Sequence, residues 1–456
     1  MASWVVPGAA LESGKGWKLW LSSTGNEAFP SGPVTVRDMQ GQIHQSRTVW
    51  SLQSPLPGLD RKIGIATVLL RHPRAGRLYS VEIPGLEPVR LRSLPDTLDK
   101  PVSFMFSSCF WHPADREGRY AAAVKAIPSH WTPAFKFLLG DQVYCDWPAD
   151  LSWDFRARTA YEVYGSRYHT YWSDEAYRAM LGTSPNFFLC EDHEYWNDYP
   201  EFQFHLMRSW RGYRDAYAQA ADRYYQAFQA CNNPSDTRWY TFHVSPVSFF
   251  VSDSRSGRQP HRSPASQFFV EEQWRALEAW ATALRGPGLL VLGQPLLQKD
   301  GDFRDHSLSN FRRDYDRLWT VLERATHDIF LISGDIHTNR YSIARRGSRT
   351  VREFIASPAA MIRPGSTTPE TPPSLIRVGE GERARTWKVD QDPYLCLSNT
   401  VGLVRMSQGT NRRIRLELGL WQIRPHNVPD RPEGRATHAY AEGDFRFVLR
   451  DEVELR

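Results

Sequence analysis

Side chains that could bind metal ions follow five apolar segments of this chain. The stretch FKFLLGDQVYCD ends its apolar run at Gly140 and then presents Asp141 and Tyr144. Four other segments have the same form, FMFSSC, NFFLCEDHE, SFFVSDSR and DIFLISGDIH, and the polar residues at or just after their ends are Cys109, Asp192, His193, Asn197, Asp253, Arg255, Asp335 and His337. Oxygen donors together with an imidazole and a thiol indicate more than one metal ion, because hard cations prefer oxygen and softer ones prefer nitrogen or sulfur.

The reaction that such a set of ligands could support is phosphoryl transfer. Two cations about 4 Å apart can hold a phosphoryl group and lower the pKa of a bridging water, which supplies a hydroxide nucleophile at neutral pH. A single Asp or Asn at a strand end is more often the cap of a turn. The repetition at five strand ends favours the metal site over that structural explanation.

The apolar segments themselves predict buried strands. The run 135–139 is apolar with one interruption, as in a strand covered on both faces, and its carboxyl end is where open α/β sheets bind ligands. Strands alternate with amphipathic helices from about 100 to 375, which predicts an α/β catalytic domain. Residues 1–99 hold short β-rich segments between turn residues and predict a β-sandwich domain. After a Pro- and Gly-rich linker at 363–383, residues 376–456 predict antiparallel strands that extend or cover the catalytic sheet.

Amphipathic patterns predict helices around residues 115–127, 161–171, 210–228, 270–284 and 315–322. In the second of these, Tyr161, Tyr164, Tyr168 and Tyr171 recur at spacings of three and four, so their rings share one helical face. In a chain with 17 Trp, such a stripe is more typical of a packed core than of a ring-lined cleft. The pattern alone leaves both interpretations open.

The composition is that of a globular protein and indicates neither a nucleic-acid nor a membrane partner. The 456 residues are 41% hydrophobic and 23% charged, and the net charge of +5 allows an anionic substrate. Lys and Arg are scattered rather than grouped in a stripe, and five Cys without CxxC spacing predict plain thiols. We find no signal peptide and no run of about 18 apolar residues. The chain as given is therefore predicted to be cytoplasmic, or extracytoplasmic if a signal has been removed.

Four motifs, each after an apolar strand, give the chain a resemblance to a known family. They are GDQVY at 140–144, EDHEYWND at 191–198, DSR at 253–255 and GDIH at 334–337, with supporting matches in SSC at 107–109, Gln273-Trp274 and Ser357-Pro358. In this order they resemble the PhoD-like alkaline phosphatases within the calcineurin-like metallophosphoesterases, over residues 100–360. The resemblance implies a metallophosphoesterase-type layered α/β sandwich behind an N-terminal β-sandwich. It also implies a phosphate-ester substrate.

The resemblance further implies which residues hold which metal. The implied ligands of a ferric ion, Fe(III), are Cys109, Asp141 and Tyr144. The implied ligands of one or two calcium (Ca) ions are Asp141 as a bridge, Asp192 or Asn197, and Asp335, while His337 matches the histidine that closes the GDxH motif.

Two further residues receive catalytic roles from the same resemblance. His193 stands where relatives keep the histidine that protonates the leaving group. Arg255 is placed to clamp phosphate, being planar and bidentate, although a structural pairing with Asp253 explains it equally well. The chain departs from the family pattern at Glu191, where the family tends to have Asp, and in lacking a twin-arginine export signal.

These observations predict a metal-dependent phosphoesterase that hydrolyses diesters in preference to monoesters, with hydroxide attacking phosphorus in line and His193 protonating the departing oxygen. A strict phosphomonoesterase is one alternative. A non-catalytic polymer-binding protein that retains the fold is another, from a different class. A two-zinc hydrolase is disfavoured because the histidines are not clustered.

Overall fold

Two facing β-sheets form the centre of the molecule in the computed structural model. The structure describes residues 3–25, 28–115, 118–147, 159–235, 237–263, 265–299, 307–361, 369–390, 394–409, 411, 413–424 and 445–456. The first part of the predicted linker, residues 363–368, lies outside this set. Among the described residues, no helix is long and apolar enough to cross a membrane.

The first sheet has parallel strands at one end and antiparallel C-terminal strands at the other. Its order is β11 (Asn186–Phe188), β10 (Phe135–Leu138), β9 (Val102–Ser107), β21 (Asn399–Gln408), β22 (Ile414–Arg424) and β23 (Phe447–Leu455). Strands β9, β10 and β11 are parallel, and β21 pairs antiparallel to β9. Strands of the C-terminal segment therefore complete this sheet.

The second sheet contains the other predicted parallel strands. Its order is β12 (Tyr240–Val244), β13 (Val247–Val251), β14 (Gly288–Val291), β15 (Ile329–Ser333), β17 (Arg349–Ile355), β16 (Asn339–Arg346), β19 (Arg385–Val389) and β18 (Leu375–Val378), with β20 (Tyr394–Cys396) paired to β16. Strands β13, β14, β15 and β17 are parallel. The five motif-bearing segments are thus divided between two sheets, three on the first and two on the second.

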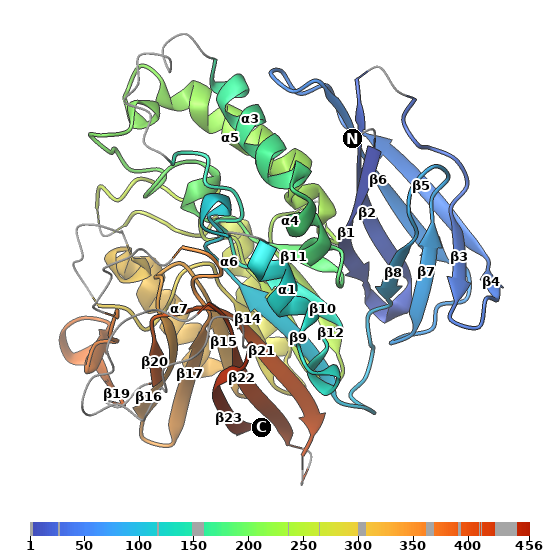
Figure 1. Cartoon of the computed structure of the whole chain (residues 1–456). Helices are drawn as coiled ribbons and strands as arrows, with labels where there is room; N and C mark the ends of the chain where they lie inside the picture. Colours follow the sequence, from blue (N-terminus) through green and yellow to red (C-terminus); the bar gives the residue numbers. More distant parts are fainter. Residues whose placement is uncertain are drawn as a thin grey trace.

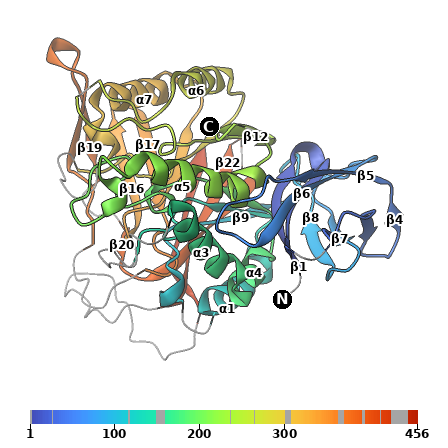
Figure 2. The same ribbon diagram turned by 90° about the horizontal axis from the view of Figure 1, so that it is seen from above.

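Alternate side chains of the central strands enter different cores, which explains their unbroken apolar sequences. Phe104 and Phe106 of β9 lie in the core between the sheets, together with Phe249 of β13. Met105 lies instead in the outer core, which the helices α1 (Arg119–Lys125), α3 (Ala160–Ser173), α4 (Glu175–Leu181) and α5 (Arg214–Phe228) cover. Phe250 faces the opposite outer core under α6 (Glu271–Ala283) and α7 (Arg312–Arg324). Figure 2 shows α6 and α7 on one side and α1 and α4 on the other, so the mixed α/β fold is layered.

The N-terminal residues form two four-stranded antiparallel sheets, in agreement with the strand-rich prediction. One has the order β1 (Ser3–Leu11), β2 (Gly16–Thr24), β6 (Arg61–Leu70) and β5 (Ser46–Leu52), and the other β4 (Ile43–His44), β3 (Thr35–Asp38), β7 (Leu78–Glu82) and β8 (Val89–Arg92). They are the blue strands beside the helical layer in Figure 1. Trp20 joins them to that layer: its ring centroid lies 4.8 Å from that of Trp172 in α3, and its Nε1 donates to Ala227 O in α5 at 2.8 Å.

The tyrosine stripe of α3 belongs to the packed core. Tyr164, Tyr168 and Tyr171 are almost fully buried in the outer core of the first sheet. The helix begins with a capping box between Thr159 and Glu162, which satisfies free backbone N–H groups of its first turn. These buried rings are not available to a ligand. The interpretation of the stripe as a packed core is therefore confirmed, rather than that of a ring-lined cleft.

A buried lysine anchors β10 to the loop before β11. The Nζ of Lys136 donates to Ser184 O at 2.8 Å, Thr183 Oγ1 at 3.0 Å and Leu181 O at 3.2 Å. Lys136→Met should remove the donor to Ser184 O and Thr183 Oγ1, at about 1–3 kcal/mol for each group left buried and unpaired, whereas Leu181 O keeps its bond from Asn186 Nδ2 at 3.0 Å. The free energy of unfolding should fall by about 2–4 kcal/mol. Chemical denaturation measures the change. The exposed Lys125→Met is the matched control and should be nearly neutral; equal losses from both substitutions would contradict an anchoring role.

Candidate metal centre

The carboxyl ends of the parallel strands of both sheets meet at one edge of the molecule. Cys109, two residues after β9, has its Sγ 3.3 Å from Asp141 Oδ2, which follows β10. The same Sγ lies 3.4 Å from the backbone O of Asp335, which follows β15 in the other sheet. Asp335 N in turn donates to Ser108 Oγ at 3.1 Å. The predicted ligands from the two sheets therefore converge.

Five residues at this edge have left-handed backbone conformations although none is glycine. The φ values are 56° for Cys109, 53° for Asp141, 60° for Asp198, 73° for Asp335 and 50° for His337. Such conformations cost roughly 1–3 kcal/mol each and persist where the surrounding structure imposes them, often at functional sites. Gly140 has φ 95°, and a Cβ at that position would lie 2.4 Å from Cβ of Glu191. Only glycine fits there, because β10 and β11 approach so closely.

Two groups of potential ligands share the carboxylate of Asp192. Ligand atoms of Asp141, Asp192 and His193 lie within 4.8 Å of one another, as do those of Glu191, Asp192 and Asp335. Asp192 is buried, and its Oδ1 has no hydrogen-bond partner among the described residues. A buried carboxylate oxygen without a donor is costly unless a cation satisfies it. The donors present therefore fit bound metal ions.

The sulfur and phenol donors lie on the Asp141 side of this arrangement. Tyr144 OH is 3.4 Å from Asp141 Oδ2 and 3.4 Å from His337 Nε2, and Ser357 Oγ donates to Cys109 Sγ at 3.2 Å. Burial, reinforced by the neighbouring acidic groups, raises the pKa of both the Cys109 thiol and the Tyr144 phenol well above their usual values. A bound cation would offset that penalty and favour the thiolate and phenolate.

His193 is held by a carboxylate that the motifs did not identify. Its Nδ1 lies 2.7 Å from Asp146 Oδ1, and its ring centroid lies 4.1 Å from that of Tyr144. Burial lowers the pKa of the imidazole, but the carboxylates of Asp146, Asp192 and Asp141 outweigh it and raise that pKa well above its usual value. The imidazolium form is therefore favoured, with Nδ1–H donating to Asp146.

Glu194 holds two strand ends of the first sheet in place. Its carboxylate accepts hydrogen bonds from the backbone N of Asp141 at 2.9 Å, of Gln142 at 2.7 Å and of Glu191 at 3.0 Å. In the second sheet, Gln294 follows β14 and its Nε2 donates to Asp335 Oδ2 at 2.9 Å. Sequence reasoning missed both residues. The signals were present, since Glu194 lies within the EDHE motif and Gln294 directly follows the apolar run LLVLG.

Arg255 and Asn197 have partners other than those the sequence suggested. The guanidinium of Arg255 is fully buried, and its Nε donates to Glu191 Oε2 at 2.6 Å. Its NH1 donates to Tyr199 O at 2.9 Å, while Asp253 accepts from the backbone N of Arg255 rather than from its side chain. The side-chain amide of Asn197 donates to Asp198 Oδ2 at 2.9 Å.

Glu191, where the family pattern tends to have Asp, connects neighbouring strand ends. One of its carboxylate oxygens accepts a hydrogen bond from Arg255 Nε, and the other accepts one from Ser254 Oγ at 3.2 Å. Burial raises the pKa of Glu191 to about 7, despite the opposing effect of the Arg255 and Arg258 guanidinium groups. The Glu191–Arg255 pair joins the end of β11 to the end of β13, and so connects the two sheets beside Asp192.

The architecture is thus two facing sheets between helical layers, with the candidate ligands converging at the carboxyl ends of the strands. The solved structures that share this architecture include that of PhoD, which is 14% identical, with a TM-score of 0.60 and with 98% of this chain and 91% of that chain covered. A purple acid phosphatase from yellow lupin (Lupinus luteus) seeds is 11% identical, with a TM-score of 0.56 and with 94% of this chain and 74% of that chain covered. No protein-family model and no curated protein sequence matches the chain. The resemblance to PhoD is confirmed as a shared fold.

Proposed function

We propose that this protein is a metal-dependent phosphoesterase. The observation that carries the proposal is the Asp192 carboxylate, buried, without a donor on Oδ1 and common to two groups of ligands. It lies at the strand ends of a fold shared with two proteins described as PhoD and a purple acid phosphatase. Metal ions bound there would act as Lewis acids toward a phosphoryl group and lower the pKa of a water molecule.

The two sides of Asp192 differ in donor chemistry, and we assign different metals to them. Cys109, Asp141 and Tyr144 supply a thiolate, a carboxylate and a phenolate, which suit Fe(III). The other side offers the carboxylates of Asp192 and Asp335, which suit one or two calcium ions. Asn197 and His337 complete the proposed ligand set, Asn197 through its carbonyl and His337 from its position 3.4 Å from Tyr144 OH.

The chain's own residues would orient the substrate and move the proton. Because Nδ1 of His193 faces Asp146, Nε2 is the atom left to donate a proton to the departing oxygen. Arg255 remains a predicted phosphate ligand, but its pairing with Glu191 favours a role in positioning the carboxylates over direct contact with substrate. Diesters carry one negative charge fewer than fully ionised monoesters, so an acidic site in which Arg255 is already paired with Glu191 supports the proposed diester preference.

The test is hydrolysis by the purified protein before and after removal of metal. We expect a chromogenic diester to be hydrolysed faster than its monoester analogue, and chelation to abolish both activities while the circular dichroism spectrum is retained. Restoring iron and calcium should restore activity. A clear monoester preference would establish the strict phosphomonoesterase instead. A folded, metal-loaded protein inactive on every ester tested would favour the polymer-binding alternative.

The ferric assignment predicts a visible absorption band. Thiolate and phenolate are electron-rich ligands, and when they absorb visible light they transfer an electron to Fe(III). Calcium and zinc ions cannot accept that electron. Tyr144→Phe and Cys109→Ser should therefore each weaken or shift the band and lower the iron content, which absorption and metal analysis measure together. The matched control is Cys231→Ser, which replaces a buried thiol whose Sγ contacts Ala227 O. It should leave both the absorption band and the iron content unchanged. A colourless, iron-free and fully active preparation would contradict the ferric site but not the phosphoesterase.

A further inference from the structure

A polar cavity lies at the opposite edge of the sheets from the candidate metal centre. Its volume is about 1420 Å³, and its walls come from the segments before β14 and β15, the start of β17 and the hairpin between β21 and β22. The metal centre lies at the other ends of the same parallel strands. The length of β15, Ile329–Ser333, is roughly 17 Å at about 3.3 Å per residue, so the two edges are at least that far apart. The two sites are therefore distinct.

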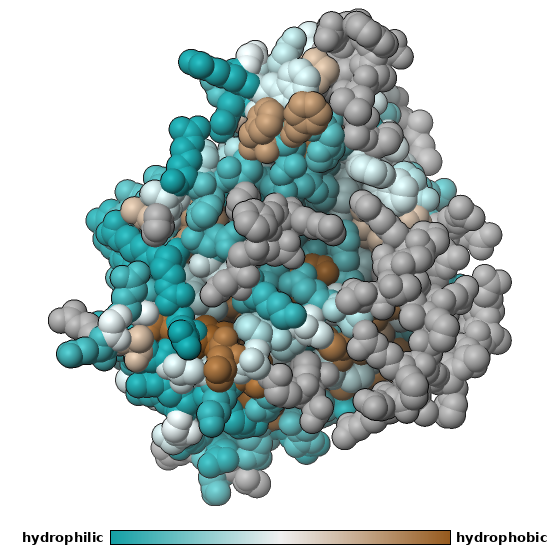
Figure 3. All heavy atoms as spheres, turned by 90° about the vertical axis from the view of Figure 1, so that its left-hand side faces the viewer, coloured by the Kyte–Doolittle hydropathy of each residue, from teal (hydrophilic) through white to brown (hydrophobic). Residues whose placement is uncertain are grey.

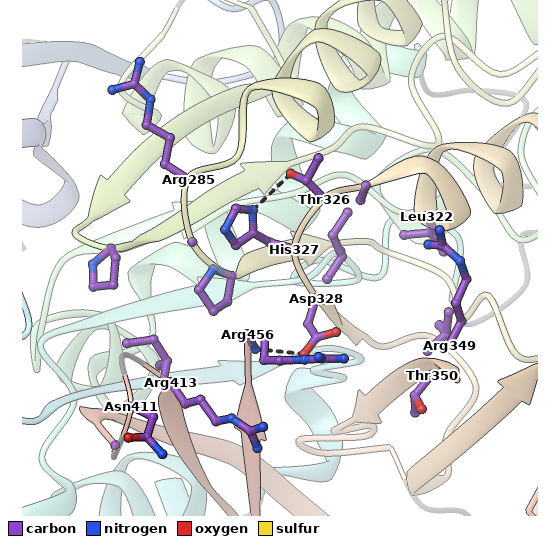
Figure 4. A pocket seen from close by; sticks show the side chains of 18 of the residues that line it. Arg285, Leu322, Thr326, His327, Asp328, Arg349, Thr350, Asn411, Arg413 and Arg456 are labelled. Carbon is purple, nitrogen blue, oxygen red and sulfur yellow. Dashed lines mark hydrogen bonds between the residues drawn. The ribbon is translucent and has the colours of Figure 1, made fainter. Parts of the chain in front are cut away.

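Arginine dominates the charged side chains of this cavity. Five arginines line it, against the carboxylates of Asp99 and Asp328, and they are Arg285, Arg324, Arg349, Arg413 and Arg456. All five are exposed to solvent. Figure 4 shows Arg413 and Arg456 below Asp328 and Arg349 to its right, while Arg285 extends away from them. Positive groups thus surround the cavity from several elements.

The nearby acidic groups offset only part of this charge. Asp99 and Asp328 face five arginines, and Asp328 Oδ2 accepts a hydrogen bond from Arg456 N at 2.8 Å. Arg413 pairs with Glu454 at 3.3 Å, but both side chains are more than a third exposed, and exposed pairs of this kind are weak. Figure 3 shows the left-hand face of Figure 1, where hydrophilic side chains surround small hydrophobic areas. The five arginines line the edge of the sheets opposite the strand ends that carry the candidate metal ligands.

The size and the charge of the cavity indicate what kind of anion would fit. Pockets for drug-sized ligands occupy about 300–1,000 Å³, so this cavity has room for more than a single phosphate ion. Of its apolar lining residues, Pro246 is exposed, whereas Pro287, Leu322 and Trp387 are buried. Guanidinium groups bind phosphate oxygens through paired hydrogen bonds. A ligand with several phosphates matches both the size and the charge.

We propose that this cavity binds an anion that carries two or more phosphate groups, such as a nucleoside triphosphate. Arg349 lies at the hairpin between β16 and β17 in the second sheet, and Arg413 lies at the hairpin between β21 and β22 in the first sheet. A ligand that contacts both arginines would therefore bridge the two sheets. Binding here does not depend on the metal centre or on its proposed activity.

Calorimetry on a protein with a disabled metal centre tests this site. The full-length Asp192→Asn variant, treated with chelator, is titrated with adenosine triphosphate and with inorganic tripolyphosphate. We expect both to bind, and both to bind more weakly as salt is raised. Adding Arg349→Gln and Arg413→Gln should weaken binding about tenfold or more.

The control replaces two exposed arginines of the N-terminal sheets, Arg47→Gln and Arg90→Gln, and so changes the net charge equally. It should bind both probes as the parent does. Failure of both probes to bind the parent would overturn the proposal, as would equal weakening in the two double variants. Tighter binding of a single-stranded oligonucleotide than of either probe would identify a nucleic-acid surface instead. None of these outcomes bears on the phosphoesterase activity.

Discussion

Replacing Asp192 by asparagine is expected to abolish most of the metal binding and most of the hydrolysis. Asp192 is a proposed calcium ligand, and it also belongs to the group that contains Asp141 of the proposed ferric site, so its loss should affect both sides of the centre. Its Oδ1 accepts no hydrogen bond from the described residues, while its Oδ2 accepts one from Asp198 N at 2.6 Å. Lewis-acid stabilisation by metal contributes several kcal/mol to the transition state, so kcat/KM should fall by about 10³-fold or more.

Metal analysis and diester hydrolysis of the same preparation measure this loss. The matched control is Asp314→Asn, another buried carboxylate, which accepts from Phe268 N at 3.0 Å and from Trp274 Nε1 at 3.2 Å, away from the strand ends. That change should lower stability and leave metal content per folded molecule intact. If Asp192→Asn retained full metal content and activity, the ligand assignment and the proposal built on it would be wrong.

The strands and their ends could be predicted because both depend on short-range pattern. The run FKFLL is apolar because β10 is covered on both faces, and the turn that follows requires Gly140. Helix α3 was likewise predictable from its spacing, within a few residues of Ala160–Ser173. The assignment of strands to two facing sheets was not, because a strand buried in either sheet has the same local sequence. The three-domain division stays a prediction, and strands from 376–456 are built into both sheets.

The partners of the site residues were harder to predict than the residues themselves. Arg255 was expected either to clamp phosphate or to pair with Asp253, two positions away, but its side chain pairs with Glu191, 64 positions away. Gln294 contacts Asp335 across 41 positions. Such pairs form because the sheets bring distant strand ends together. The spacing of neighbouring residues in the sequence does not indicate which strand ends will meet. Asp146 is the exception, since an acidic residue two positions after Tyr144 could have been included from the sequence.

The last prediction concerns His193, whose position allows two roles. It is one of the potential ligands beside Asp141, and it is also an imidazole oriented by Asp146 with Nε2 directed elsewhere. If it is the general acid, His193→Gln should slow hydrolysis of diesters with poor leaving groups by about 10²- to 10⁴-fold. Esters of nitrophenol should lose much less, because nitrophenolate departs without a proton. Metal content should stay near that of the parent.

Asp146→Asn separates orientation from proton donation. The amide keeps the size of the side chain but removes the charge that faces Nδ1 at 2.7 Å, so the variant should show a smaller loss with the same dependence on the leaving group. Steady-state rates on a series of diesters with leaving groups of graded pKa measure both variants. If His193→Gln lost the same factor on every ester and lost metal in proportion, His193 would be a ligand. The proton would then have to come from another group or from water.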